Sequence, residues 1–557
     1  MTVAPPLQAV KRIIPRTVKR AIKVAARRAT YNSPGFRHFP PRGYRLKDYA
    51  SWFPLTGEVF LRYLKRGDLP SVLGGEREGG RIGLVVTPWV GTSVPWYAIM
   101  LGIGLAHRGR EVVLIWDDSG FPERDVEGQQ RSIAKVLAWV GHYLQVIRVS
   151  EHGGGDSKPR EVELIDRLTQ QNVTWSLRGA VPTQAEFGVV ERIRQSLTES
   201  RPLIQGALSG ADLDCLVVPG GVYGTSGLFM DEAAARGWRV ATFDTDRRIA
   251  QICVSGVAAQ NGDIPIAFQA LWDSGPKARQ EAVEVAEAEF RDRCETRDEY
   301  GFQVAPAGWT EGGTENCILI PLNVEWDTAA LGRHAAFEST ADWLLSTVNE
   351  LLALDAGPVV VRQHPSERRK LQRSHLDIAN LLKSRFGNDP RCRFVAADDP
   401  ICSYDLMRSA RLVLPYVSTI GIEAAAMAKP VLISGQCYYG ELGFVWSTAS
   451  RDEYFELLHR GLRGELPLLP GQVERAWLCY YLVAVRNRVS TDFTPHPDDF
   501  WSWCQQPPSS LFSDPVVSDI LEAIDTGVPI SILRHDLGGL HPDTSHQALL
   551  GALPPLS

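Results

Sequence analysis

RLVLPYVSTIGIEAAAMAKPVLISG, residues 411–435, contains the pattern from which the fold is predicted. Its apolar run at 411–416 predicts a strand, 417–419 form a short polar loop, and the alanine-rich residues 420–428 predict a helix. A proline and a second apolar run then predict another strand. Strand, helix and strand in this order are typical of a parallel sheet whose faces are covered by helices.

The same alternation occurs in two parts of the chain, separated by a polar helical stretch. The first part begins at RIGLVVTPW (81–89), and the second begins at CILIPLNVEWD (317–327). We therefore predict an α/β fold with two Rossmann-like, doubly wound domains facing a cleft. The expected divisions are a basic arm at 1–47, a first domain at 48–272, a helical linker at 273–312, a second domain at 313–463, and a C-terminal extension at 464–557 that packs back on the body.

Composition limits the class of protein. A chain of 557 residues is too long for one core, and 44% hydrophobic with 22% charged residues is ordinary for a globular protein. No apolar run reaches the length of a transmembrane helix, and the start lacks the features of a secretory signal. Nine cysteines without a CxxC pair indicate reduced thiols of a cytoplasmic protein rather than a disulfide or zinc framework.

Charge is distributed unevenly along the chain. Residues 1–47 contain twelve Lys and Arg and no Asp or Glu, which leaves 47 basic against 65 acidic side chains elsewhere. Apolar residues such as Leu7, Val10 and Ile14 recur at helical spacing in this arm, although Pro15 would kink a helix there. This pattern predicts a helix on an anionic membrane surface, with a disordered tail as the alternative. The acidic body argues against nucleic acid as a partner.

The stretch 411–435 also predicts a ligand site, since ligands of open α/β sheets bind beyond the carboxyl ends of the strands. Ser418 and Thr419 precede the predicted helix, whose free N–H groups and dipole favour a phosphate. Gly421 would let a ligand approach the backbone. The Glu423 carboxylate is placed to accept a hydrogen bond from a sugar hydroxyl, unless it is simply solvated.

A second cluster follows the preceding strand, in VVVRQHPSERR (359–369). Arg362 offers a bidentate fork for a phosphate. His364, restrained by Pro365, can donate to a phosphate or protonate a leaving group. Glu367 lies in the same loop. The cluster lies one crossover from the predicted helix start, which favours a site over an isolated surface histidine.

Other polar residues end predicted strands and could face the same cleft. The candidates for a catalytic base or for contacts with the donor are Asp117, Asp118, Asp244, Asn323 and Asp327. A solvated turn is the alternative for the three aspartates of the first domain. In TPWVGTSVPW (87–96), Trp89, Thr92 and Ser93 would suit an acceptor sugar, although tryptophan is also common in cores.

RQHPSERR followed by LVLPYVSTIGIEAAAMAKPVLISG resembles the bacterial capsule polysaccharide biosynthesis family (KpsC/KpsS-like) and, more loosely, GT-B glycosyltransferases. The resemblance covers about residues 316–460. It implies that His364 and Pro365 contact the donor phosphate, that Ser418 and Thr419 cap it, and that Glu423 holds the ribose or base. Val431 departs from the E-x7-E pattern of some retaining enzymes.

The resemblance implies an enzyme that moves a sugar from a CMP-, UDP- or GDP-linked donor to a hydroxyl of a surface polysaccharide or glycolipid. Because no DxD motif follows a strand in a suitable context, we expect no metal and no cofactor. The expected location is the cytoplasm, against the inner face of the cell membrane. A nucleotide-sugar 2-epimerase of similar fold and a non-catalytic carbohydrate-binding scaffold of an export complex are the alternatives.

Overall fold

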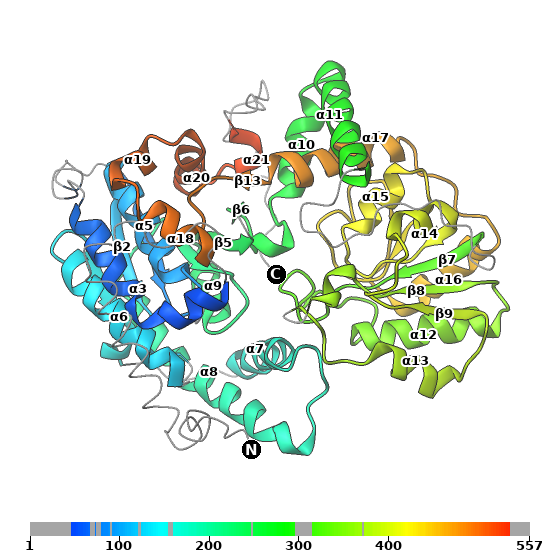
Figure 1. Cartoon of the computed structure of the whole chain (residues 1–557), viewed down its shortest axis with the longest axis horizontal. Helices are drawn as coiled ribbons and strands as arrows, with labels where there is room; N and C mark the ends of the chain where they lie inside the picture. The colour runs from blue at the N-terminus through cyan, green and yellow to red at the C-terminus, as the bar shows by residue number, and fades with distance from the viewer. Residues whose placement is uncertain are drawn as a thin grey trace, which may run out of the picture.

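The computed structural model describes residues 46–66, 69, 73, 79–89, 92–120, 124–153, 160–246, 249–295, 315–369 and 372–534. The arm predicted at residues 1–47 lies almost entirely outside them. In this described part, no helix is both long enough and apolar enough to cross a membrane. Figure 1 shows two α/β lobes side by side.

The first lobe is built on a seven-stranded sheet with the order β13-β6-β5-β4-β1-β2-β3. Its strands are β1 (Arg81–Val86), β2 (Glu111–Trp116), β3 (Gln145–Arg148), β4 (Cys215–Pro219), β5 (Arg239–Asp246), β6 (Ile249–Cys253) and β13 (Val489–Ser490). Strands β3, β2, β1, β4 and β5 are parallel, whereas β6 is antiparallel to β5 and β13. The parallel part has the strand order of a Rossmann domain.

Alternate residues of the parallel strands face two separate apolar clusters, as expected for a sheet covered on both faces. Leu84 and Leu114 belong to the cluster with α3, α5 and α6, whereas Val85 and Val113 belong to the cluster with α7, α8 and α9. These helices are α3 (Leu46–Arg66), α5 (Val94–His107), α6 (Arg124–Val140), α7 (Arg160–Ser176), α8 (Phe187–Leu208) and α9 (Ser226–Ala235).

The second lobe has a four-stranded parallel sheet with the order β10-β7-β8-β9. The strands are β7 (Cys317–Pro321), β8 (Val359–Arg362), β9 (Cys392–Val395) and β10 (Ala410–Val413), and a short pair, β11 (Leu432–Ile433) and β12 (Trp446–Ser447), follows. The helices are α12 (Thr340–Ala353), α13 (Ile378–Phe386), α14 (Ser403–Ser409), α15 (Ile420–Ala426) and α16 (Arg451–Leu462). Because β7 lies between β8 and β10, the loops after these three strands leave the sheet side by side.

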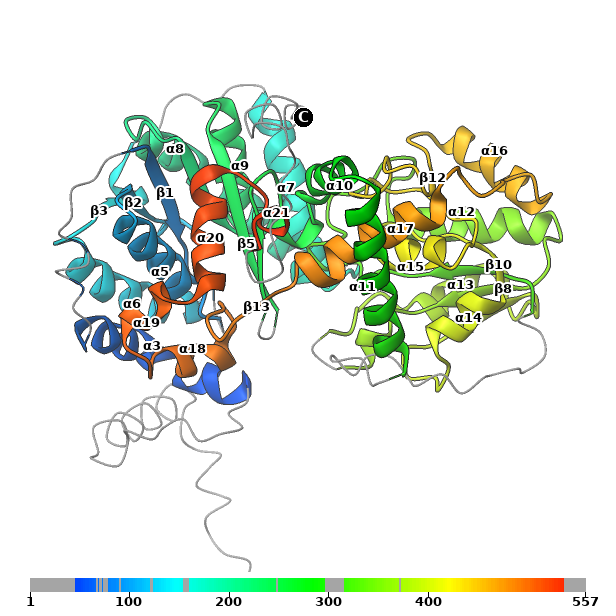
Figure 2. The ribbon, with the colours of Figure 1, turned by 90° about the horizontal axis from the view of Figure 1, so that it is seen from above.

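Segments distant in sequence join the two lobes. An apolar cluster combines α15 with α10 (Ile264–Asp273), α11 (Pro276–Glu295), α17 (Gln472–Tyr481) and the π-helical turn η6 (Leu482–Arg486). The chain then returns to the first lobe, where β13 pairs with β6. Beyond it lie α18 (Pro497–Trp503), α19 (Pro508–Phe512), α20 (Pro515–Thr526) and α21 (Ile530–Leu533). Figure 2 shows α20 beside α5 and β1, far from the second lobe.

These two sheets, with the pocket between them, confirm the predicted class, an α/β protein with two Rossmann-like domains facing a cleft. In the stretch 411–435, the strand ends at Val413, earlier than predicted, and the helix begins at Ile420 as predicted.

Candidate functional site

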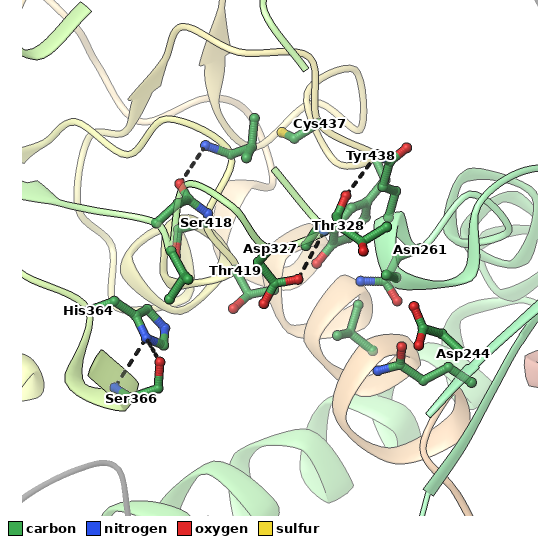
Figure 3. A pocket seen from close by; sticks show the side chains of 18 of the residues that line it. Asp244, Asn261, Asp327, Thr328, His364, Ser366, Ser418, Thr419, Cys437 and Tyr438 are labelled. Carbon is green, nitrogen blue, oxygen red and sulfur yellow. Dashed lines mark hydrogen bonds between the residues drawn. The ribbon is translucent and has the colours of Figure 1, made fainter. Parts of the chain in front are cut away.

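A pocket of about 650 Å³ lies between the two lobes. The second lobe contributes the loops after β7, β8, β10 and β11, and the first lobe contributes β5, β6 and the residues after them. Figure 3 shows His364, Ser418 and Thr419 together on one part of the wall, with Asn261 and Asp244 across from them. The predicted site residues that line it are Trp89, Asp244, Asn323, Asp327, His364, Ser418, Thr419 and Glu423.

His364 follows β8 and precedes the short turn η5 (Pro365–Arg368). Its Nδ1 accepts the backbone N–H of Ser366 at 3.2 Å and lies 2.7 Å from the Ser366 hydroxyl oxygen. Since Nδ1 accepts a backbone hydrogen bond, the proton of the neutral ring is on Nε2. The loop therefore sets His364 to act as a donor through Nε2. Pro365 is buried in the turn and restrains this geometry without lining the pocket itself.

The loop of Ser418 and Thr419 is held by its neighbours in the sheet. Val417 N–H donates to the Asn323 side-chain oxygen at 3.2 Å, and the Tyr439 hydroxyl donates to the Ser418 carbonyl at 2.6 Å. These bonds join the loops after β7, β10 and β11, so the two hydroxyls are held at the pocket wall.

Gly421 has a different role from the one predicted. It does not line the pocket, and a Cβ at this position would overlap the hydroxyl of the buried Tyr439. Glycine is therefore needed here because the Tyr439 ring packs against the backbone, and not because a ligand approaches it.

Glu423 is buried at the pocket and has a basic partner that the sequence did not suggest. Arg293 of α11 lies 3.3 Å from its carboxylate, and the exposed fractions of the two side chains are 31% for Arg293 and 7% for Glu423. Burial alone would lower the pKa of Arg293, but the adjacent carboxylate raises it above the ordinary value. Arg293 lies in the stretch predicted as a linker, where nothing in the local pattern distinguishes it from a solvated arginine.

Arg333, in the loop after β7, is a second pocket residue that the sequence did not indicate. Its guanidinium makes no hydrogen bond or ion pair within the part of the chain that the structure describes. Burial lowers its pKa, yet an arginine stays charged at neutral pH. An unneutralised cation at the wall of a pocket favours an anionic ligand. Arg369 and Arg488 add further positive charge to the lining.

Arg362 is not placed to bind a phosphate. Its buried guanidinium donates to the carbonyl of Ala396, to that of Ile401 at 3.2 Å, and to the Ser403 hydroxyl at 3.3 Å. Burial lowers its pKa to about 10. It supports the loop after β9, so this placement contradicts the predicted role.

Glu367 also points away from the pocket. Its carboxylate accepts the backbone N–H of Ser374 at 2.9 Å and the Gln363 amide at 3.2 Å. Burial raises its pKa, while these hydrogen bonds lower it in part. The carboxylate therefore stabilises the loop after β8 and is not presented to a donor.

Asp117 and Asp118 are likewise engaged within the first lobe. Asp117 is fully buried and accepts from three hydroxyls, those of Thr87, Ser119 and Thr225. Burial raises its pKa, and these bonds lower it in part. Asp118 pairs with Arg148 at 2.6 Å. Because neither carboxylate lines the pocket, Asp244 is the remaining candidate base among the predicted aspartates of the first lobe.

Of the three residues predicted to bind the acceptor, one lies at the pocket and two do not. Trp89 lines the pocket, but Thr92 and Ser93 do not. The Thr92 hydroxyl donates to the Trp89 carbonyl at 2.9 Å, and the buried Ser93 hydroxyl donates to the Pro495 carbonyl at 2.5 Å. These two residues hold the loop that positions Trp89 and are not available to a ligand.

Glu325 precedes the pocket residue Trp326, and its raised pKa leads us to expect that the stability of the protein depends on pH. Burial, followed by repulsion from Glu367, raises its pKa from 4.5 to about 7. Between pH 4.5 and about pH 7, the Glu325 carboxyl keeps its proton in the folded protein but loses it in the unfolded chain. The free energy of unfolding therefore falls as the pH rises through this range. We expect Glu325→Gln to raise the free energy of unfolding by about 2 kcal/mol at pH 8 and by nearly nothing at pH 4.

Urea unfolding at the two pH values measures this difference. The exposed Glu338→Gln variant is the matched control and should show no pH-dependent gain. An equal effect of Glu325→Gln at both pH values would contradict the prediction.

The fold and the pocket define a two-domain α/β protein with a pocket between its domains. Residues 309–456 match the family model described as "Capsule polysaccharide biosynthesis protein". This match confirms the predicted resemblance to that family for about a quarter of the chain. A comparison with curated proteins gave no match.

Several solved structures show a distant likeness. One is KpsC of Thermosulfurimonas dismutans, a β-Kdo 2,4 transferase, with 13% identity over 48% of this chain and 79% of that chain and a TM-score of 0.32. Another is the β-Kdo 2,7 transferase of KpsC from the same organism, with 14% identity over 58% of this chain and 88% of that chain and a TM-score of 0.30. UDP-GlcNAc 2-epimerase from Neisseria meningitidis, bound to UDP-GlcNAc, also matches, with 12% identity over 73% of this chain and 99% of that chain and a TM-score of 0.24. TM-scores this low do not carry an activity over to this chain. Among the described residues, no group of three or more His, Cys, Asp or Glu could hold a metal ion.

Proposed function

We propose that this protein is a glycosyltransferase of surface polysaccharide assembly. It transfers a sugar from a CMP-, UDP- or GDP-linked donor to a hydroxyl of a capsule-type polysaccharide or a glycolipid. The observation that carries the proposal is what the second lobe contributes to the pocket lining, namely the His364 ring, the Ser418 and Thr419 hydroxyls and the Arg333 guanidinium. Figure 3 shows the first three of these residues on one part of the wall. The family match, which includes all four residues, supports it.

The chemistry follows from which groups face each other. The acceptor oxygen attacks the anomeric carbon of the donor, and the bond between that carbon and the phosphate oxygen breaks. Its electron pair goes to the phosphate oxygen, where His364 Nε2–H and the Arg333 guanidinium stabilise the developing charge. The proton of the acceptor hydroxyl passes to Asp244 on the opposite domain.

The proposal includes no metal and no cofactor, because basic side chains and a ring N–H supply the stabilisation that the departing phosphate needs. Activity should therefore survive dialysis against EDTA. A loss of activity that Mg²⁺ or Mn²⁺ restores would overturn this part of the proposal.

Nucleotide binding is the first test. CMP, UDP, GDP and NAD are added at equal concentration, and the cognate nucleotide at a hundred times its dissociation constant should stabilise the protein by about 2.7 kcal/mol. Arg333→Ala removes a charged hydrogen-bond donor and should weaken that nucleotide about tenfold, which lowers the stabilisation to about 1.4 kcal/mol. The exposed Arg385→Ala on α13 is the matched control.

Three other outcomes are informative. Stabilisation by NAD alone, or by no nucleotide, would contradict a nucleotide-sugar site. Binding of a nucleotide sugar without slow hydrolysis or transfer would indicate a scaffold rather than an enzyme. An equal response of the Arg333 and Arg385 variants would remove Arg333 from the site.

We further propose that residues 1–47 hold the protein on the cytoplasmic face of the cell membrane. Each basic residue near an anionic surface contributes about 1 kcal/mol. Replacing five bases by glutamine should therefore reduce binding to phosphatidylglycerol-containing vesicles at least a hundredfold; the positions are Lys11, Arg12, Lys19, Lys23 and Arg27. Flotation with these vesicles measures the binding of the protein, and vesicles of phosphatidylcholine alone are the control. Equal flotation of the variant and the unchanged protein would contradict the prediction.

A further inference from the structure

Three tryptophans from different parts of the chain line the pocket. Trp89 follows β1, Trp175 lies near the end of α7, and Trp326 follows β7 of the other lobe. Each of the three residues is half-buried and lines the pocket. Among the three, only Trp89 was suggested by the sequence. Trp326 lies between the predicted Asn323 and Asp327 but was not itself predicted, and Trp175 lies in a stretch without a recognisable site pattern.

Further contacts connect these rings into one surface. Tyr223 lies between two of them, with its ring centroid 3.9 Å from that of Trp175 and 5.4 Å from that of Trp89. The Arg178 guanidinium lies 3.8 Å from the centroid of Trp326 and 5.5 Å from that of Trp175. The surface formed by Trp89, Trp175, Tyr223 and Trp326, here called the aromatic wall, thus continues from one lobe to the other.

The backbone at the end of α7 holds the aromatic wall across the cleft. Arg178 has a left-handed φ of 54°, and its carbonyl accepts the His375 N–H of the second lobe at 2.8 Å. Gly179 follows with a φ of 79° and packs against Glu325. A non-glycine residue keeps such a conformation only where its surroundings compensate the strain, as they do at many ligand sites. The rings are therefore positioned before a ligand binds.

The aromatic wall and the Arg293–Glu423 pair reach the pocket from different helices. Glu423, Arg293 and Tyr480 approach it from α15, α11 and α17, whereas Trp175 approaches it from α7. Figure 1 shows α7 on one side of the gap between the lobes and α11 and α17 on the other. A ligand on the α7 side would therefore lie away from the Arg293–Glu423 pair.

Accessible tryptophan faces provide apolar, electron-rich surfaces of the kind that pack against the C–H groups of a sugar ring. Tryptophan loses little conformational entropy on binding and often contributes much of the affinity at a binding surface. Two of the rings belong to the first lobe, opposite the donor loops of the second, which is where an acceptor must lie for its hydroxyl to reach the donor sugar.

We propose that the aromatic wall is the acceptor subsite and that the acceptor is a saccharide chain whose rings stack on Trp89, Trp175 and Trp326. This inference rests on the proposed glycosyltransferase function and adds the class of acceptor and the residues that bind it. Arg178 and Tyr223 act as positioning residues, since they hold the tryptophans through ring contacts.

The test is affinity electrophoresis through gels that contain surface polysaccharide purified from the source organism. The unchanged protein should be retarded, and Trp175→Ala and Trp326→Ala should each lower the apparent affinity about tenfold. Trp175→Phe keeps an aromatic face and should recover part of the loss. Trp139→Ala, which removes a half-buried tryptophan of α6 outside the pocket, should migrate like the unchanged protein.

Stabilisation by the cognate nucleotide, measured on the same variants, separates the two proposals. Retained nucleotide stabilisation together with lost retardation supports an acceptor subsite. A simultaneous loss of both would mean that the aromatic wall is structural or binds the donor, and unchanged retardation would also overturn the inference. If the unchanged protein binds the nucleotide but not the polysaccharide, the acceptor proposal fails alone; if it binds the polysaccharide but no nucleotide, the proposed function fails.

Discussion

Replacing His364 by alanine is expected to lower kcat for sugar transfer by about a hundred- to a thousandfold, with little change in the affinity for the nucleotide. The reason is that His364 lines the pocket and its Nδ1 contacts Ser366, so that the Nε2 proton is the one proposed to act on charge that develops only in the transition state. Steady-state kinetics with the cognate nucleotide sugar, together with a thermal melt that confirms folding, measures the effect.

Ser366→Ala is the matched control for this prediction. It removes the hydroxyl but leaves the backbone N–H that bonds Nδ1, so the orientation of the ring is mostly kept. We expect a loss of about tenfold or less. Transfer by the His364→Ala variant within a few-fold of the unchanged protein would show that the ring has no part in the chemistry.

Replacing Arg293 by alanine should lower the free energy of unfolding by about 2 kcal/mol, because it leaves the buried Glu423 carboxylate without its ion-pair partner. Breaking a fully buried pair costs about 3–5 kcal/mol, and we expect less here since Arg293 is partly exposed. Glu423→Gln should cost about half as much, because the cation that it leaves behind can reach water. Urea unfolding measures both variants.

Arg279→Ala provides the control on the same helix. Arg279 pairs with Glu474, whose side chain is 42% exposed, so the loss should be about 1 kcal/mol or less. Combining Arg293→Met with Glu423→Gln should recover part of the stability, since neither residue is then charged. Equal losses for the Arg293 and Arg279 variants would mean that the pair in the pocket is no stronger than a surface pair.

The Arg293–Glu423 pair also shows how the part of the pocket beside α15 is completed. α15 supplies Glu423, and α11 and α17 pack against α15 in one apolar cluster. Residues nearly two hundred positions apart, 293 and 480, therefore line the same pocket as Glu423. A variant that loosens α11 should consequently affect both the stability of the second lobe and nucleotide binding.

Some predictions from the sequence failed for an identifiable reason. Arg362 and Asp117 each lie at the end of a buried strand, where a polar residue usually faces a ligand site. Both instead form hydrogen bonds within their own lobe. Arg362 donates to carbonyls of the loop after β9, and Asp117 accepts from three hydroxyls of the first lobe. The position of a residue at a strand end is visible in the sequence, but the direction of its side chain depends on partners from other segments.

By itself the sequence determined the alternation of strands and helices and the two sheets that follow from it. It also determined that the loops after β8 and β10 meet, because parallel strands end at the same edge of a sheet. His364, Ser418 and Thr419 could be found for that reason. Only the tertiary structure brought Arg293, Arg333 and Trp175 to the pocket. Their places depend on how the helices pack and how the lobes face each other, and these long-range contacts have no local pattern.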